Sequence, residues 1–187
     1  MLLCVAGHRQ GSDLSIMMCR EEIYLSLGAN IGDRFSQLHQ ALSLLAPEVE
    51  ISDCSSIYET EPWGFRPQPA FLNLVCRGYT QLTPEDLLAC VRGIEKQIGR
   101  RHLRQRYGPR VIDIDILFYS QRVLCQSNLC IPHPRLVERA FVLVPLVELA
   151  PNFLHPSLRR TVRQLQAVVD DKNEVCLWAP PPCLGST

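Results

Sequence analysis

The clearest pattern in the chain lies in Val111–Tyr119, where Asp113 and Asp115 alternate with Ile112, Ile114 and Ile116. Successive side chains of a strand point to opposite faces, so the two carboxylates share one face and the isoleucines share the other. We expect the isoleucine face to lie in the core. Adjacent carboxylates repel unless a cation joins them, and Mg²⁺ usually takes one or two carboxylates plus substrate phosphates. The alternation therefore predicts a strand with a cation site on one face.

Hydrophobic periodicity elsewhere in the chain predicts further strands and helices. The predicted strands are Ile23–Leu27, Val49–Tyr58, Ala70–Thr80 and Glu174–Trp178. The predicted helices are one with Phe35, Leu38, Leu42 and Leu45 on its buried face, one from Pro84 to Ile98 between a Thr83 cap and Gly99, one over Val137–Leu149 that starts or kinks at Pro145, and one with Leu158, Val162 and Leu165 buried. Residues 121–129 read as a short hairpin or excursion.

The element order is β-α-β-β-α-β followed by helices, which predicts an α+β fold. The order is that of a ferredoxin-like split βαβ core, with an antiparallel-rich sheet and helices packed on it in three α/β/α layers. The 187 residues suit one domain. We expect that domain to span residues 22–178, with residues 1–21 as a disordered extension and residues 179–187 as a disordered tail.

Composition narrows the function mainly by exclusion. A formal net charge of +0 argues against general attraction to nucleic acid or anionic membrane. The apolar run Leu2–Ala6 is too short for a signal peptide or a membrane span. The nine cysteines include no Cys-x-x-Cys pair, so they read as thiols in a reducing compartment. We therefore expect a cytoplasmic protein, and the absence of Walker A and Rossmann motifs excludes those modes of nucleotide binding.

Residues 100–110 form a basic loop, Arg-Arg-His-Leu-Arg-Gln-Arg-Tyr-Gly-Pro-Arg, directly before the aspartate strand. Arginine's planar fork suits phosphate, although most arginine runs are solvated turns. His133, held between two prolines, could contact a phosphate or lie in a surface turn. The proline-rich loop 59–69 carries Trp63 and Phe65 and could be a lid or a hydrophobic clip. The adjacency of the basic loop to the carboxylate pair favours a nucleoside triphosphate site.

Phe71 and Asn73 share one face of a predicted strand. An aromatic ring and an amide at this spacing can hold a flat heterocycle, since one stacks and the other bonds to its edge. The alternative is a core phenylalanine beside an asparagine that the backbone satisfies, and the pattern alone favours this alternative.

From about Ile23 to Pro151 the chain resembles the 6-hydroxymethyl-7,8-dihydropterin pyrophosphokinase family of folate biosynthesis. The resemblance rests on short blocks in the expected order. These blocks are residues 24–34 (Tyr-Leu-Ser-Leu-Gly-Ala-Asn-Ile-Gly-Asp-Arg), 55–64, 71–73 (Phe-Leu-Asn), 94–100, 106–117, 131–136 (Ile-Pro-His-Pro-Arg-Leu) and 139–151.

The resemblance implies transfer of pyrophosphate from ATP to the hydroxymethyl group of a reduced pterin, which leaves AMP. It implies two Mg²⁺ ions on Asp113 and Asp115, ATP as co-substrate, and catalytic roles for Arg100, Arg110 and Asp115. The implied ATP-binding residues are Glu95, Arg100, Arg106, Tyr107, Arg110, His133 and Arg139. The implied pterin-binding residues are Thr60, Pro62, Trp63, Phe71, Asn73 and Phe141. The implied partners are these two small molecules, with the chain a monomer or a weak homodimer.

Some positions depart from the family's usual pattern. Asn128 stands where a basic residue is expected, Cys130 where a hydroxyl residue is common, and Tyr107 where tryptophan is frequent. The middle of the basic loop, His102-Leu103, also differs. The departures at Asn128 and Cys130 weakly motivate an alternative, a non-catalytic module that senses a nucleotide or pterin. An RNA-binding domain of similar strand order is a third alternative, which the zero net charge and the acidic central strand oppose.

Overall fold

The computed structural model describes residues 20–62, 67–99, 108–170 and 174–183. Asp33 and Thr83 cap the first two helices, accepting from the backbone N–H groups of Ser36 and Asp86, and Gly99 ends the second with a φ of 110°. The described elements are β1 (Glu21–Ala29), α1 (Arg34–Leu45), β2 (Val49–Cys54), β3 (Ile57–Thr60), β4 (Phe71–Thr80), α2 (Pro84–Ile98), β5 (Asp113–Tyr119), β6 (Leu124–Cys125), β7 (Cys130–Ile131), the 3₁₀ turn η1 (Leu136–Glu138), α3 (Ala140–Leu149), α4 (Val162–Val168) and β8 (Val175–Ala179).

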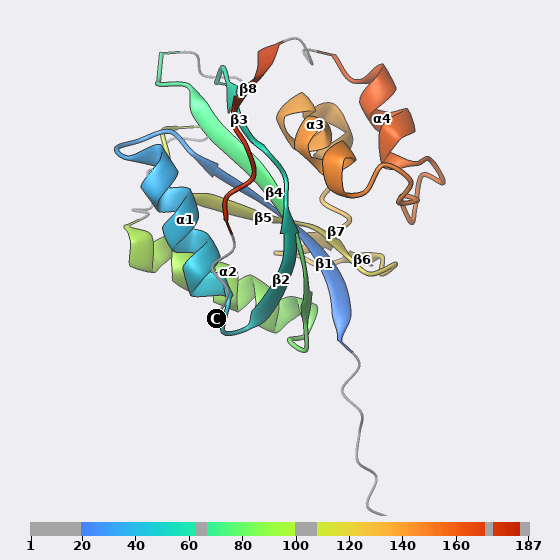
Figure 1. The fold of residues 1–187 in the computed structure, drawn as a ribbon. Coiled ribbons are helices and arrows are strands. Elements are labelled where there is room, and N and C mark those ends of the chain that lie inside the picture. Colours follow the sequence, from blue (N-terminus) through green and yellow to red (C-terminus); the bar gives the residue numbers. More distant parts are fainter. Residues whose placement is uncertain (1–19, 63–66, 100–107, 171–173, 184–187) are drawn as a thin grey trace, which may run out of the picture.

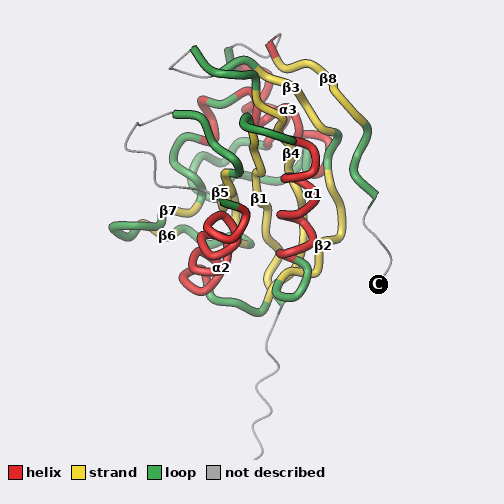
Figure 2. The backbone as a smooth tube through the Cα atoms, turned by 90° about the vertical axis from the view of Figure 1, so that its left-hand side faces the viewer, coloured by secondary structure: helices red, strands yellow, loops and turns green. Residues whose placement is uncertain are grey.

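The main sheet has the strand order β5-β1-β4-β3-β8, with β2 also paired to β4. Each of these pairings is antiparallel. Strand β4 lies between β1 and β2, and β1 lies between β4 and β5, which is the split βαβ arrangement. Helices α1 and α2 cover one face, and α3 and α4 cover the other (Figures 1 and 2). The predicted α+β fold with three α/β/α layers is confirmed.

The single strand predicted over Val49–Tyr58 is two strands, β2 and β3, separated at Ser55 and Ser56. The Ser55 hydroxyl accepts from Val75 N at 2.9 Å, and Ser55 N donates to Val75 O at 2.9 Å. The serine thus holds the chain against β4 where the strand is interrupted. Strand β3 then pairs with the start of β4, which places Thr60 opposite Phe71.

The sheet has a buried cluster on each face. The isoleucines of β5 lie in the cluster under α1 and α2, as predicted. On the other face, Tyr24, Val75 and Leu117 pack against α3 and α4. Polar residues of the same strands continue this second face: Asp115 lies opposite Ser26, while Gly28 lies opposite both Asp113 and Asn73.

Several local predictions need correction. Phe35 is 39% exposed and contacts Trp178 of β8 instead of the core. Leu158 is exposed and precedes α4, whose first turn forms a capping box between Thr161 and Gln164. The helix predicted over Val137–Leu149 is divided into the 3₁₀ turn η1 and helix α3, and Pro145 lies inside α3.

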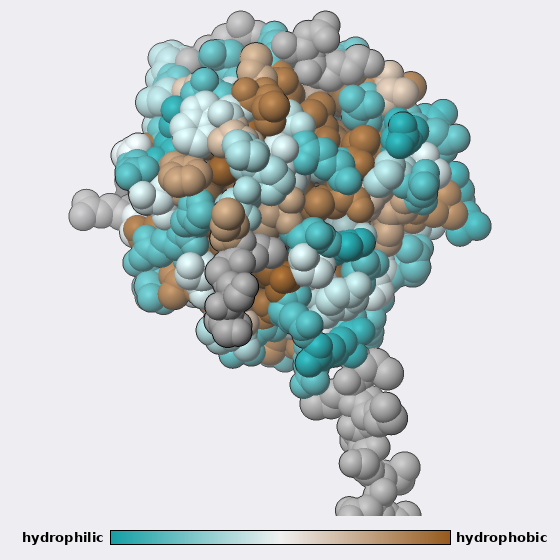
Figure 3. Space-filling model, in the orientation of Figure 1, coloured by the Kyte–Doolittle hydropathy of each residue, from teal (hydrophilic) through white to brown (hydrophobic). Residues whose placement is uncertain are grey.

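At the chain ends and the surface, the structure adds three observations. Strand β8 includes Ala179 and Pro182 is buried, so ordered chain continues past residue 178. Hydrophobic and hydrophilic patches alternate on the face in Figure 3. Among the described residues, every helix is too short or too polar to span a bilayer.

Candidate active site

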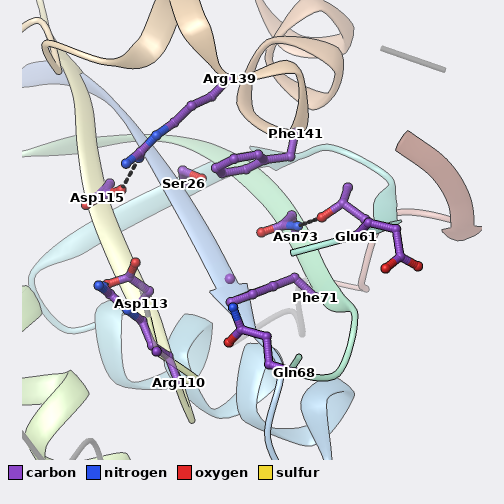
Figure 4. A pocket seen from close by; sticks show the side chains of 13 residues that line it. Ser26, Glu61, Gln68, Phe71, Asn73, Arg110, Asp113, Asp115, Arg139 and Phe141 are labelled. Carbon is purple, nitrogen blue, oxygen red and sulfur yellow. Dashed lines mark hydrogen bonds and ion pairs between the residues drawn. The ribbon is translucent and has the colours of Figure 1, made fainter. Parts of the chain in front are cut away.

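A cavity of about 260 Å³ opens on the α3 side of the sheet (Figure 4). Strands β1, β4 and β5 form its floor, and Arg139 and Phe141 close it from the start of α3. Its lining residues are Ser26, Gly28, Thr60, Glu61, Gln68, Phe71, Asn73, Gly108, Arg110, Asp113, Asp115, Arg139 and Phe141. The cavity thus combines two aromatic rings, two side-chain amides, three carboxylates and two guanidinium groups.

Asn73 is the fixed polar group of this cavity. Its side chain is 3% exposed, and its Nδ2 donates to Thr60 Oγ1 at 2.7 Å. Figure 4 shows it between Phe71 and Phe141. A Cβ at Gly28 would lie 2.7 Å from Asn73 Oδ1, so the glycine leaves the space that the amide occupies. An amide edge between two rings matches the recognition of a flat heterocycle.

A second cavity of about 380 Å³ lies at the β5 edge of the sheet, between α2 and the β6–β7 hairpin. Its lining residues are Leu88, Val91, Arg92, Glu95, Arg110, Asp113, Ile114, Asp115, Ile116, Gln126, Ser127, Asn128, Leu129, Cys130, His133 and Pro134. The two cavities share Arg110, Asp113 and Asp115. These three residues therefore lie at the junction of the two cavities, where two bound ligands could meet.

The shared carboxylates are both paired with arginines. Arg110 forms an ion pair with Asp113, and Arg139 Nη1 lies 3.0 Å from Asp115 Oδ2. His133 Nε2 lies 3.8 Å from the same Asp115 oxygen. Burial lowers the pKa of His133 despite the Asp115 charge, and its Nδ1 accepts from Arg135 N at 3.2 Å. His133 is therefore a neutral imidazole whose Nε2–H faces Asp115.

Glu95 joins α2 to the strand that carries the aspartates. It is 5% exposed, and its Oε1 accepts from Ile114 N at 2.9 Å. This backbone N–H lies on the free edge of β5, because β1 is the neighbour of β5 in the sheet. A buried carboxylate that accepts from it fixes the strand next to the second cavity.

Asn30 is a site residue that the sequence patterns did not single out. It is 1% exposed, its Oδ1 accepts from Arg110 N at 2.6 Å, and its own N–H donates to Arg110 O at 3.0 Å. Its Nδ2 donates to Gln68 Oε1 and Pro69 O at 3.1 and 3.0 Å. One side chain thus links the loop after β1 to both loops that border the first cavity. The only sequence signal was its turn position after a strand.

The paired carboxylates fit a Mg²⁺ site. The described residues contain no cluster of three or more His, Cys, Asp or Glu side chains that could hold a metal alone. Mg²⁺ does not need such a cluster, since it keeps waters and takes phosphate oxygens from its substrate. Asp113 and Asp115 lie on one face of β5 and at both cavities, so they could hold a cation that is completed by a bound phosphate chain.

The structure brings most of the predicted site residues together. Those in the first cavity are Thr60, Phe71, Asn73, Arg110, Asp113, Asp115, Arg139 and Phe141. Glu95 and His133 line the second cavity, as do the departures Asn128 and Cys130. Pro62 is buried and lines neither cavity. Trp63, Arg100, Arg106 and Tyr107 lie outside the described residues.

Comparison with known proteins identifies relatives over most of the chain. An Aquifex aeolicus 2-amino-4-hydroxy-6-hydroxymethyldihydropteridine pyrophosphokinase is 42% identical over 144 residues, which are 77% of this chain and 89% of that protein. The Dictyostelium discoideum folic acid synthesis protein FOL1 is 38% identical over 88% of this chain. An Arabidopsis thaliana folate synthesis bifunctional protein is 45% identical over 69% of it. The chain spans about a quarter of these last two proteins, 25% and 27%.

Solved structures show the same fold. A structure titled as HPPK-DHPS in complex with substrates matches with a TM-score of 0.65 at 17% identity, covering 80% of this chain and 43% of that one. A Plasmodium falciparum HPPK-DHPS with pteroate matches with a TM-score of 0.65 at 18% identity, covering 84% and 44%. The model of the 7,8-dihydro-6-hydroxymethylpterin-pyrophosphokinase (HPPK) family matches residues 24–151. The chain belongs to the HPPK family.

Proposed function

We propose that this chain transfers pyrophosphate from ATP to the hydroxymethyl group of 6-hydroxymethyl-7,8-dihydropterin, giving the pterin diphosphate and AMP for folate biosynthesis. Family membership over residues 24–151 supports the reaction. The observation that carries it structurally is the sharing of Asp113, Asp115 and Arg110 by two adjacent cavities. A transfer between two substrates needs both to reach the same charged groups.

The first cavity is proposed to hold the pterin. Phe71 and Phe141 would stack on its two ring faces, and Asn73 would read its edge with a geometry that Thr60 fixes. The predicted pterin contacts of Pro62 and Trp63 remain proposals. The hydroxymethyl group would then point toward Asp113 and Asp115 on β5.

The second cavity is proposed to hold ATP. Glu95 and His133 line it, Arg110 lines both cavities, and Arg139 of the first cavity pairs with the shared Asp115. The neutral His133 can donate its Nε2–H to a phosphate oxygen, and the guanidinium groups can bind phosphates through paired donors. Arg100, Arg106 and Tyr107 are proposed as further ATP contacts.

The reaction forms a bond between the pterin hydroxyl oxygen and the β-phosphorus of ATP, and it breaks the β-phosphorus bond to the bridging oxygen of AMP. Bound Mg²⁺, held by Asp113 and Asp115 and proposed as two ions, would neutralise charge on the phosphate oxygens. Arg110, and by prediction Arg100, would stabilise the same charge as it shifts to the leaving oxygen. Asp115 is proposed to accept the hydroxyl proton, and the two cavities would hold the reacting atoms in line.

The test is to incubate the chain with ATP, Mg²⁺ and the hydroxymethyl-dihydropterin and to measure AMP. Formation of ADP alone, or of no product, would contradict the proposal. Asp113→Ala or Asp115→Ala should lower turnover by at least ~10²-fold, the scale of losing one preorganised electrostatic group. Asp53→Ala is the matched control, because Asp53 pairs with Arg77 away from both cavities and should leave turnover unchanged. Normal turnover in Asp113→Ala or Asp115→Ala would contradict the proposal that these two aspartates bind Mg²⁺.

A non-catalytic module that senses a nucleotide or pterin is the second candidate, motivated by Asn128 and Cys130 in the wall of the second cavity. Calorimetry that shows ligand binding without AMP release would favour it. Cytoplasmic location, a monomer or weak homodimer, and small molecules as the only partners remain predictions. Size-exclusion chromatography with light scattering would test the oligomeric state.

A further inference from the structure

Cys125 and Cys130 face each other across the β6–β7 hairpin. Their Sγ atoms are 2.7 Å apart, against about 2.05 Å in a formed disulfide. Cys125 is exposed and Cys130 is partly buried. A movement of less than about 1 Å would therefore bring the two sulfurs to bonding distance.

The hairpin register suits a bond between these two cysteines. Gln126 N donates to Leu129 O at 2.8 Å, which makes Gln126 and Leu129 the hydrogen-bonded pair next to the turn. Paired positions in an antiparallel ladder alternate, so Cys125 and Cys130 form a non-hydrogen-bonded pair with Cα atoms about 4.5 Å apart. That spacing lies within the range of roughly 4.4–6.8 Å found for disulfides.

A second pair of cysteines shows what the hairpin pair does differently. Cys54 and Cys76 are also cross-strand partners, between β2 and β4. Both are buried in the core under α1 and α2, and burial raises the pKa of Cys54 to about 12 and also raises that of Cys76. Thiolates react and thiols do not, so this core pair is inert. The hairpin pair combines the same cross-strand placement with solvent access.

The hairpin also forms one wall of the second cavity. Five consecutive residues, Gln126 through Cys130, line it, whereas Cys125 does not. Gln126 Nε2 donates to Glu85 Oε1 at 2.7 Å, and Arg92 Nη2 donates to Asn128 O at 3.5 Å, so the hairpin rests against α2 (Figure 2). Two-residue strands form a marginal sheet on their own. The wall can thus adjust unless a covalent bond fixes it.

We propose that Cys125 and Cys130 are a redox-active dithiol, a site that reacts with low-molecular-weight disulfides and that responds to occupancy of the second cavity. The Cys125 thiolate attacks one sulfur of the small disulfide and releases one small thiol. The Cys130 thiolate then attacks Cys125 in the mixed disulfide and releases the second. Two protein thiols and one disulfide become one protein disulfide and two small thiols, so two electrons pass to the small disulfide.

The exposure of the two residues sets this order. Cys125 is accessible to a small disulfide, and contact with its sulfur raises the pKa of the Cys130 thiol. Cys130 acts second, within the hairpin, once Cys125 is in the mixed disulfide. The Cys125–Cys130 disulfide closes a ring that contains the five wall residues. This ring would oppose the adjustment of the wall around a nucleotide. The dithiol form is therefore the one that binds nucleotide more tightly, a step that rests on the proposed function of the second cavity.

The covalent site is tested without any nucleotide. The chain is incubated with glutathione disulfide, free thiols are alkylated, and peptides are mapped by mass spectrometry. The expected product is a Cys125–Cys130 disulfide, with loss of two hydrogen atoms. Cys125→Ser should lose it, while Cys176→Ser, an exposed cysteine on β8, should retain it. Glutathione attached to Cys125 with no internal disulfide would overturn the proposal.

The coupling is tested by repeating the redox titration with and without ATP and Mg²⁺. With ATP and Mg²⁺ present, half-oxidation of the dithiol should need a higher ratio of glutathione disulfide to reduced glutathione. The increase should be at least about fivefold, the low end of usual coupling between sites. Calorimetry of the reduced and oxidised chain should show the same factor in ATP affinity. Equal affinities would overturn the coupling alone. No ATP binding in either state would overturn the proposed function and the coupling together, and it would leave the disulfide result standing.

Discussion

Replacement of Gly28 by alanine is the sharpest probe of how the first cavity is built. Gly28 lies in the central strand β1 with ordinary strand backbone, so the substitution adds only a methyl group. That Cβ would lie 2.7 Å from Asn73 Oδ1 and 3.8 Å from Phe71 Cδ1. Asn73 cannot easily move aside, because it is 3% exposed and its Nδ2 is held by Thr60.

The clash should appear as lost pterin affinity. The methyl group overpacks the site and displaces the amide, and the loss of the amide's hydrogen bonds to the pterin edge costs about 1–3 kcal/mol of binding free energy. At about 1.4 kcal/mol per tenfold, we expect the pterin Kd to rise roughly 5- to 150-fold. ATP affinity should stay within about twofold, because Gly28 is absent from the lining of the second cavity.

Calorimetry with the pterin and with an ATP analogue measures both affinities. Gly93→Ala is the matched control, since a Cβ at Gly93 in α2 meets nothing within 4 Å. It should stabilise the helix by roughly 0.5–1 kcal/mol and leave the pterin Kd unchanged. Gly78→Ala, whose Cβ would meet Glu50 O at 2.8 Å, should lower stability without a selective effect on pterin. A stably folded Gly28→Ala chain with wild-type pterin affinity would refute the assignment of this cavity.

Two further substitutions test positioning and pH dependence. Asn30→Ala should lower the free energy of unfolding by about 1–3 kcal/mol, because a buried side chain loses its hydrogen bonds to Arg110 N and Pro69 O, and it should raise KM for the pterin. Thr83→Ala, which loses a helix cap worth about 1 kcal/mol, is the control that should lower stability at unchanged KM. Burial lowers the pKa of His155 from 6.5, and its Nδ1 accepts from Ser157 N and Leu158 N, so the unfolded chain binds the proton more readily. Stability should therefore fall as the pH drops through 6.5 in urea titrations, and His155→Asn should weaken that dependence; an unchanged slope would contradict it.

Local sequence patterns predicted the elements that carry the site. The strand with Asp113 and Asp115, the strand with Phe71 and Asn73, and helix α2 all appear with the predicted faces, because alternation, period and caps are contained within each segment. The corrections concern contacts between distant segments. Strand β2 ends where Ser55 bonds to Val75 of β4, and Phe35 leaves the core to meet Trp178 of β8. A short stretch of sequence around Ser55 or Phe35 does not contain the residue that it contacts.

The same reason explains which site residues were missed. Asn30 acts through Arg110, 80 residues away, and Gly28 acts by leaving space for Asn73 on the adjacent strand. Neither role has a local signature, because a turn asparagine and a strand glycine read alike in many proteins. The alternation alone predicted a cation site at the aspartates and the resemblance to the family supplied the reaction, whereas the two cavities that share the aspartates could only come from the fold.

The position of β5 at the edge of the sheet explains why its aspartates can serve both cavities. A residue of a central strand, such as Asn73 on β4, is accessible only over the face of the sheet. An edge strand is accessible over its face and also around its free side, so Asp113 and Asp115 line the first cavity from above and the second from beside. A free edge leaves backbone donors exposed, and Glu95 accepts from the one at Ile114. The Ile114 and Ile116 side chains meanwhile anchor the strand under α1 and α2. One edge strand thus presents the same two charges to two ligands, which is the arrangement that a transfer between them requires.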